Sequence, residues 1–109
     1  MKPRLEEEVR EEILAYLNKN RIFHFRIETP SLSNYPDLIL CYRGQFVAVE
    51  LKRTETTTAR LGQLKILEEV RKSEGFGAVV GSLEQLVSLL DKITKYVDTI
   101  EESMKHERN

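Results

Sequence analysis

The chain has 109 residues, a length that predicts one domain with a single hydrophobic core. Hydrophobic residues make up 40% and charged residues 32% of it, and 17 basic against 18 acidic residues give a formal net charge of −1. This balance excludes nucleic-acid binding through a strongly basic total charge, so any basic surface must be local. One cysteine excludes an intramolecular disulfide, and with only two histidines it nearly excludes a zinc site of the Cys/His type.

The sequence shows no segment that would direct the chain into a membrane or out of the cell. No apolar run approaches the roughly 20 residues that a membrane span needs. The N-terminal residues MKPRLEEEVREE are too acidic for a secretory signal or a transit peptide. We therefore expect a cytoplasmic protein without a membrane partner.

The first third of the chain predicts a helix, a strand and a loop. Apolar residues in 5–17 recur at close to every fourth position with glutamates between them, the pattern of an amphipathic helix. The acidic run 6–8 falls in its first turns, where the helix dipole favours negative charge. The segment 22–27 is β-branched and aromatic enough for a strand, and 29–35 has the Pro, Ser and Asn content of a loop.

A β-hairpin is predicted in the middle of the chain. Apolar runs at 38–42 and 46–51 flank the residues RGQ at 43–45, whose glycine is typical of a tight turn. Within the first run, Cys41 is expected to be a small core residue. A short apolar segment at 77–81, which begins and ends with glycine, predicts a buried strand beside 46–51.

Two further helices complete the pattern. A helix that ends at Gly75 carries the apolar positions Leu61, Leu64, Leu67 and Val70. The last third predicts one long helix over 82–104, with Ser82 as its N-cap. Its apolar positions alternate spacings of three and four residues in a heptad register: Leu83, Leu86, Leu90, Ile93, Val97, Ile100 and Met104.

The long apolar stripe leaves two interpretations open. In one, the first half of the helix packs on the sheet and the second half frays. In the other, the stripe associates with a second copy of the chain. In both cases residues 1–109 form a single domain, with its core at about 5–90 and the C-terminal helix at about 82–104.

The candidate chemistry is concentrated at one end of the predicted hairpin. Asp37 stands at the head of its first strand, while Glu50 and Lys52 stand at the end of the second. Because strand side chains alternate between faces, Glu50 and Lys52 share a face and Leu51 points into the opposite layer. Adjacent strands lie ~4.8 Å apart, so the two carboxylates can meet across the pair.

A divalent cation would make this arrangement favourable. Two carboxylates at a buried sheet end are costly to desolvate and repel each other, and a cation bound between them removes that cost. Asp37, Glu50 and the backbone carbonyl of Leu51 would supply oxygen ligands suited to Mg²⁺ or Mn²⁺. Lys52 can then orient or deprotonate an attacking water, or neutralise developing negative charge.

A purely structural interpretation is also open, because Glu-x-Lys on a strand is usually a solvated ion pair worth ~0–1 kcal/mol. Glu-x-Lys/Arg also occurs at 8–10 and 69–71, inside predicted helices. Two features favour the metal site: the motif closes a strongly apolar strand, and one of only three aspartates lies one hairpin upstream.

Pro36-Asp37, twelve intervening residues and Glu50-Leu51-Lys52 together resemble the PD-(D/E)xK nuclease motif. The wider pattern over about 5–90 is similar to the VRR-NUC family of that superfamily, to which small phage-type proteins belong, and to archaeal Holliday-junction resolvases. The matching features, in chain order, are the glutamates of 6–12, Phe25-Arg26-Ile27, Pro36-Asp37, Gly44, Glu50-Leu51-Lys52, Gln63 and Ala78-Val79-Val80.

The resemblance implies an α/β, restriction-endonuclease-like fold, with a central mixed sheet of about four strands flanked by helices. It implies an Mg²⁺- or Mn²⁺-dependent DNA endonuclease that acts as a homodimer on branched, flap or Holliday-junction DNA. The implied metal ligands are Asp37, Glu50 and the Leu51 carbonyl, with Lys52 as the catalytic lysine and Gln63 as a supporting helix residue.

The resemblance also implies an acidic residue from the first helix. The family commonly shows Glu-x-x-[Ile/Val]-Gln, which favours Glu6 as catalytic acid and possible metal ligand, with Glu7 as second choice. Arg10 then stands where the glutamine would be, and some relatives carry their acidic residue there. An arginine at that position cannot bind a cation.

Substrate contacts and rival functions follow from the rest of the chain. Basic residues near the hairpin and the Gln63 helix would hold phosphates without reading bases: Arg26, Arg43, Arg53, Arg60 and Lys65.

One rival to the nuclease function is a catalytically inactive module that holds nucleic acid or a partner on the same fold. Another is a helical interaction protein in which the hairpin is only core.

Overall fold

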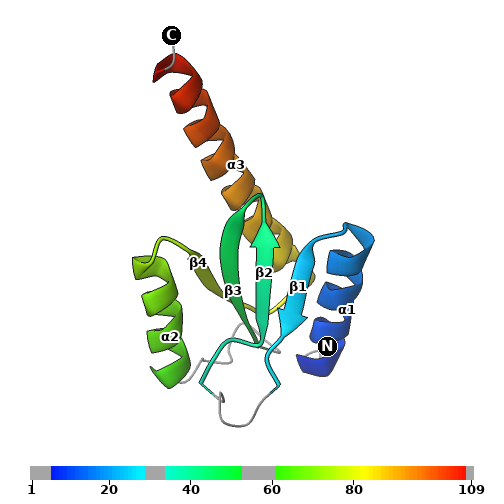
Figure 1. Ribbon diagram of the computed structural model, residues 1–109. Coiled ribbons are helices and arrows are strands. Elements are labelled where there is room, and N and C mark those ends of the chain that lie inside the picture. Colours follow the sequence, from blue (N-terminus) through cyan, green and yellow to red (C-terminus); the bar gives the residue numbers. More distant parts are fainter. Residues whose placement is uncertain (1–5, 29–33, 53–60, 108–109) are drawn as a thin grey trace.

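The computed structural model describes residues 6–28, 34–52 and 61–107. The side chains of Glu6 and Glu107 are not among the described ones. A four-stranded sheet is flanked by helices (Figure 1). The elements in chain order are α1 (Glu6–Lys19), β1 (Phe23–Arg26), β2 (Leu38–Tyr42), β3 (Gln45–Leu51), α2 (Leu61–Lys72), β4 (Phe76–Val80) and α3 (Leu83–Glu107).

The sheet is mixed, as the sequence predicts. Its strand order is β1-β2-β3-β4, with the first three strands antiparallel and β4 parallel to β3. The hairpin between β2 and β3 turns at Arg43 and Gly44, whose φ angles of 53° and 79° are typical of a two-residue type I′ turn. This turn fixes the register that pairs Leu38 with Val49, and so brings the start of β2 beside the end of β3.

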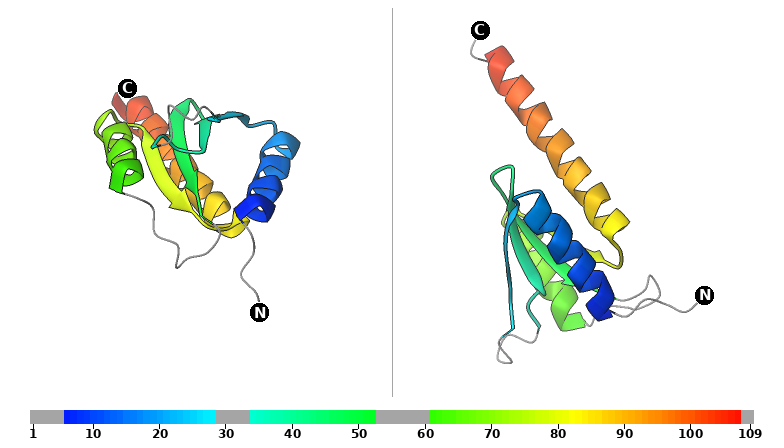
Figure 2. Two further views of the ribbon diagram at one scale, coloured as in Figure 1. Left: turned by 90° about the horizontal axis from the view of Figure 1, so that it is seen from below. Right: turned by 90° about the vertical axis from the view of Figure 1, so that its right-hand side faces the viewer.

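The helices cover the two faces of the sheet unequally (Figure 2). Helices α1 and α3 form the main core with one face, where every second residue of β3 is buried: Val47, Val49 and Leu51. Helix α2 packs on the other face, where its Leu67 meets Ile39 and Ala48. The central strand β3 is therefore buried on both sides.

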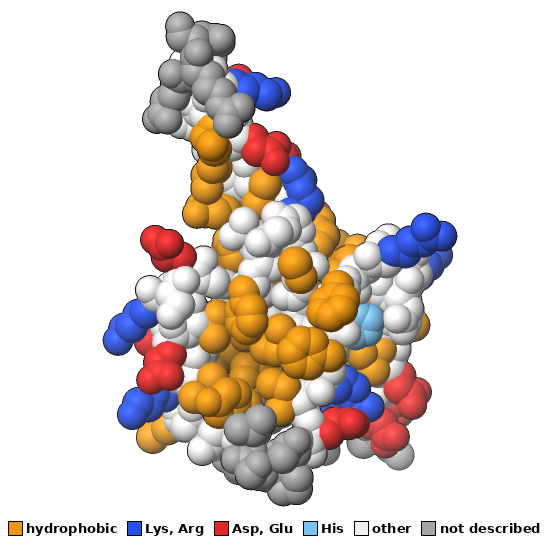
Figure 3. Space-filling view, viewed as in Figure 1, with side chains coloured by type: hydrophobic (Ala, Val, Ile, Leu, Met, Phe, Trp, Pro, Cys, Tyr) orange, Lys and Arg blue, Asp and Glu red, His pale blue; other side chains and the backbone are white. Residues whose placement is uncertain are grey.

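Much of the α2-side face is left open over β1 and β2. Phe23, Phe25 and Phe46 are half or more exposed there, and apolar side chains gather on this side of the molecule (Figure 3). Cys41 was expected in the core, but it is exposed because it shares this face with its cross-strand partners Phe23 and Phe46. Between Phe46 and α2 the face is hollowed by a groove of about 570 Å³.

Helix α3 runs beyond the sheet (Figures 1 and 2). Its first half is buried through Leu86, Leu90, Ile93 and Val97. The second half does not fray, since α3 remains helical to Glu107, and its apolar stripe is exposed. Although α3 has 25 residues, neither it nor another described helix carries an apolar stretch that could cross a membrane.

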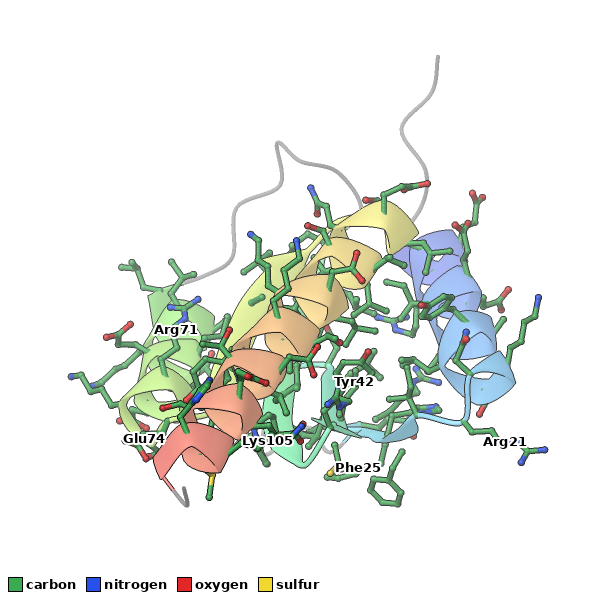
Figure 4. The ribbon with its side chains drawn as sticks, turned by 90° about the horizontal axis from the view of Figure 1, so that it is seen from above. Arg21, Phe25, Tyr42, Arg71, Glu74 and Lys105 are labelled. Atoms are coloured by element: carbon green, nitrogen blue, oxygen red, sulfur yellow. The ribbon has the colours of Figure 1, made fainter. Side chains whose placement is uncertain are left out.

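Polar contacts fasten the tip of the hairpin to α3. The Tyr42 hydroxyl is hydrogen-bonded to the Thr94 hydroxyl at 2.9 Å (Figure 4). Arg43 donates a hydrogen bond of 3.0 Å to Asp98 and lies 3.7 Å from Glu101. These contacts fix the direction in which the projecting part of α3 leaves the sheet.

Truncating a buried leucine of α3 should destabilise the fold strongly. Leu86 is fully buried, so Leu86→Ala is expected to cost about 2–5 kcal/mol of unfolding free energy. Leu61 is 84% exposed in α2, and Leu61→Ala should stay within about 0.5 kcal/mol of the wild type. Urea denaturation compares the two variants, and equal losses would contradict the packing described.

Candidate active site

The start of β2 and the end of β3 meet at the lower end of the hairpin (Figure 1), and each contributes a carboxylate there. Asp37 directly precedes β2, and Glu50 is the penultimate residue of β3. One step beyond the Leu38–Val49 pair places Asp37 opposite Glu50 on the α2-side face. The backbone N–H of Leu51 donates a hydrogen bond of 2.7 Å to Asp37 Oδ2, which fixes the orientation of that carboxylate.

Lys52 and Gln63 complete this cluster. Lys52 Nζ lies 3.6 Å from Glu50 Oε2 and donates a hydrogen bond of 3.2 Å to Gln63 Oε1. Gln63 is buried although its side chain is polar, because the start of α2 packs against this end of the sheet. The helix glutamine that the sequence singled out thus reaches the Glu-x-Lys motif and holds its lysine.

Glu50 is the least solvated charged group of the site. It is 1% exposed, and neither of its oxygens has a hydrogen-bond partner among the described residues. The pKa of Glu50 is raised from 4.5 to about 8: burial is the largest cause, a hydrogen bond to Asp37 and the charge of that carboxyl add to it, and Lys52 partly offsets the rise. In its ionised form Glu50 is therefore a buried carboxylate without a hydrogen-bond donor, directly beside a second acid.

This donor set fits a hard divalent cation. An orphaned buried carboxylate next to a second carboxylate is relieved when a cation binds between them. The Leu51 carbonyl is a suitable third oxygen, because the N–H and C=O of one strand residue point to the same side and this N–H faces Asp37. Within the described residues, no group of three His, Cys, Asp or Glu side chains forms a larger metal site.

Among the described side chains of α1, Arg10 reaches the site. Its Nη2 atom lies 4.0 Å from Asp37 Oδ1. Glu7 is exposed and does not join the two carboxylates in a three-acid group. The side chain of Glu6 lies outside the described ones, so the prediction for Glu6 stays a prediction. The resemblance favoured these glutamates over Arg10, because an arginine cannot bind a cation.

The three predicted basic residues that the structure describes do not gather into one patch. Arg26 is paired with Leu38 at the site's end of the sheet, where its side chain is exposed and lies 3.2 Å from Glu28. Arg43 lies at the opposite end of the hairpin with its acidic partners on α3. Lys65 is exposed on α2, and Arg53 and Arg60 lie outside the described residues.

Comparison with known proteins assigns the fold. No protein-family profile and no curated protein matches the sequence. A solved structure described as "VRR_NUC domain protein" is similar with a TM-score of 0.69 and 17% identity, over 83% of this chain and 88% of the other. A second, described as "VRR_NUC domain", has a TM-score of 0.66 and 27% identity, over 83% and 94%. The chain has an α/β fold of the nuclease type, and within that class it is the VRR-NUC fold.

The metal-free protein should lose stability as the pH rises. Folded Glu50 keeps its proton up to about pH 8, whereas the unfolded chain releases it near 4.5. The folded state therefore binds the extra proton between these values, and its stability falls across this window, by on the order of 5 kcal/mol. Glu50→Gln cannot ionise and should remove this slope, measured by urea unfolding in EDTA at about pH 5.5 and about pH 8.5.

Glu84→Gln provides the matched control. Glu84 is an exposed glutamate in the first turn of α3, so this variant should keep the wild-type slope. An unchanged slope in Glu50→Gln would show that Glu50 is not the titrating group.

Proposed function

We propose that this protein is a metal-dependent DNA endonuclease whose site is built from Asp37, Glu50 and Lys52. The observation that carries the proposal is the buried Glu50 carboxylate, which faces Asp37, lies 3.6 Å from Lys52 and lacks a hydrogen-bond partner among the described residues. The likeness to two VRR_NUC structures supports the same conclusion. An ordinary surface ion pair would leave Glu50 solvated, and it is 1% exposed.

Each residue of the site has a role in phosphodiester hydrolysis. Asp37, Glu50 and the Leu51 carbonyl would hold Mg²⁺ or Mn²⁺, which polarises the phosphate and lowers the pKa of a coordinated water. The Lys52 ammonium stands where it can orient the attacking water and stabilise the negative charge that develops on the phosphate. Gln63 accepts a hydrogen bond from Lys52 and keeps it in place.

The reaction adds one water across the phosphodiester bond. The water oxygen forms the new bond to phosphorus and gives up a proton to solvent. The bond from phosphorus to the sugar oxygen of the leaving strand breaks, and that oxygen takes up a proton.

Branched or structured DNA is the proposed substrate. Arg26 and Lys65 are exposed, near the site's end of the sheet and on α2 respectively, where they can contact phosphates without reading bases. Arg53 and Arg60 are proposed for the same role from the sequence. Contacts of this type give binding that depends on DNA shape and weakens with salt.

A homodimer would present two such sites to two strands, and we propose that it forms through α3. The supporting feature is the exposed apolar stripe on the projecting half of the helix, where Ile100 is 39% and Met104 47% exposed. A stripe of this kind on a helix outside the core is the pattern that packs against a second helix.

Removal of a site residue should abolish cutting and spare DNA binding. Asp37→Asn and Lys52→Ala should each lower the cleavage rate by at least about a hundredfold in Mg²⁺ or Mn²⁺. Asp91→Asn makes the same chemical change at an exposed position of α3 and should cut like the wild type. The assay uses linear, flapped and four-way DNA, with affinity measured in parallel.

The same assay tests the alternative of an inactive binding module. A wild-type protein that retains DNA, cuts none of the three substrates with either metal and keeps its affinity in Lys52→Ala would replace the nuclease by that module.

A charge in the α3 stripe should produce monomers. Ile100→Glu would place a carboxylate in the proposed helix–helix contact, whereas Ser103→Glu adds the same charge at an exposed polar position of the same helix. Sedimentation at micromolar concentration should show a monomer for the first variant and a dimer for the second. A wild-type monomer that still cuts DNA would remove the dimer from the proposal.

A further inference from the structure

Arg10 brings a positive charge from α1 to the acidic pair of the site. In this chain a guanidinium from α1 lies 4.0 Å from Oδ1 of Asp37. The other oxygen of that carboxylate, Oδ2, is held by the Leu51 N–H, so each Asp37 oxygen has a different neighbour.

A fixed cation at this distance opposes the binding of a metal ion to Asp37. If Arg10 only had to support metal binding, a neutral or acidic residue would serve better, because like charges repel at short range. Its side chain is 21% exposed and that of Asp37 27%, so the pair borders solvent and a ligand can reach it. The guanidinium is therefore placed to meet an anion that arrives with the substrate.

The charges of these four side chains also suit such an anion. Asp37 and Glu50 carry two negative charges when ionised, and Lys52 and Arg10 lie beside them with positive ones. A divalent ion between the two acids would add further positive charge, which favours the approach of a phosphodiester.

We propose that Arg10 binds the phosphate to be cleaved, beside the divalent ion that Asp37 and Glu50 would hold. This inference rests on the proposed nuclease function and deepens it. The planar guanidinium can give two parallel N–H donors to phosphate oxygens.

The two possible roles of Arg10 predict opposite effects on metal binding. In the proposed role, Arg10→Ala removes a competing cation, so Mn²⁺ should bind about fivefold more tightly. The same variant should lower cleavage by about a hundredfold and weaken Mn²⁺-dependent DNA binding. If Arg10 instead positions Asp37, both Mn²⁺ affinity and cleavage should fall together.

The experiment measures Mn²⁺ affinity and stoichiometry by calorimetry without DNA, and DNA affinity in Mn²⁺ in a Lys52→Ala background. Cleavage is measured in the otherwise wild-type chain. Lys19→Ala removes a positive charge from the far end of the same helix and should match the wild type in all three. Arg10→Lys keeps the charge but loses the paired donors, so its metal affinity should stay near wild type while cleavage falls.

Each result decides the inference. Tighter metal binding together with weaker DNA binding in Arg10→Ala supports it. Weaker metal binding or unchanged DNA binding overturns it. If the wild type cuts no DNA, the proposed function fails. The Mn²⁺ and DNA affinities of Arg10→Ala then still test whether Arg10 binds phosphate.

Discussion

The burial of one carboxylate beside another is the constraint around which this end of the molecule is arranged. Glu50 is as buried as the leucines of the core, yet its oxygens have no hydrogen-bond partner among the described residues. Such a group is unfavourable in a folded chain, and its pKa near 8 is the direct result. The neighbouring groups hold the site around it: a backbone N–H orients Asp37, and Gln63 holds Lys52.

The same strand serves both the fold and the site. Side chains of β3 alternate between two layers, so Val47, Val49 and Leu51 bury themselves against α1 and α3. Glu50 and Lys52 face the other way, where α2 supplies Gln63. A slip of one residue in the β2–β3 register would exchange these layers and bury the charges in the main core. Selection for a stable core and selection for the cluster therefore act on one register.

The features that the sequence could predict are those set by local geometry. The turn at Arg43 and Gly44 fixes the pairing, and the period of two along a strand then brings Asp37 beside Glu50. The buried face of the first half of α3 also follows from the sequence, because its apolar residues recur every three or four positions and therefore lie on one side of the helix. These elements need no knowledge of how distant parts of the chain are placed.

The features that could not be predicted depend on which area each helix covers. Cys41 lies in an apolar strand, but it is exposed because α2 covers only part of its face. The contact from α1 is equally non-local: Glu7 and Arg10 lie within about one helical turn, and the docking of α1 brings Arg10 to Asp37 while Glu7 stays exposed. The apolar periodicity of a helix identifies which of its faces is buried. The surface that this face packs against depends on the packing of the whole chain.

The fastening of the hairpin tip to α3 has a consequence for how a pair of subunits would handle DNA. Tyr42 and Arg43 tie the projecting helix to one end of the β2–β3 ladder, and the acidic pair sits at the other end. The helix advances about 1.5 Å per residue, so its length and tilt would set the distance between the two sites of the proposed dimer. Two chains joined along it would hold their cutting centres at one set separation, and incisions on opposite strands would be spaced by the protein itself.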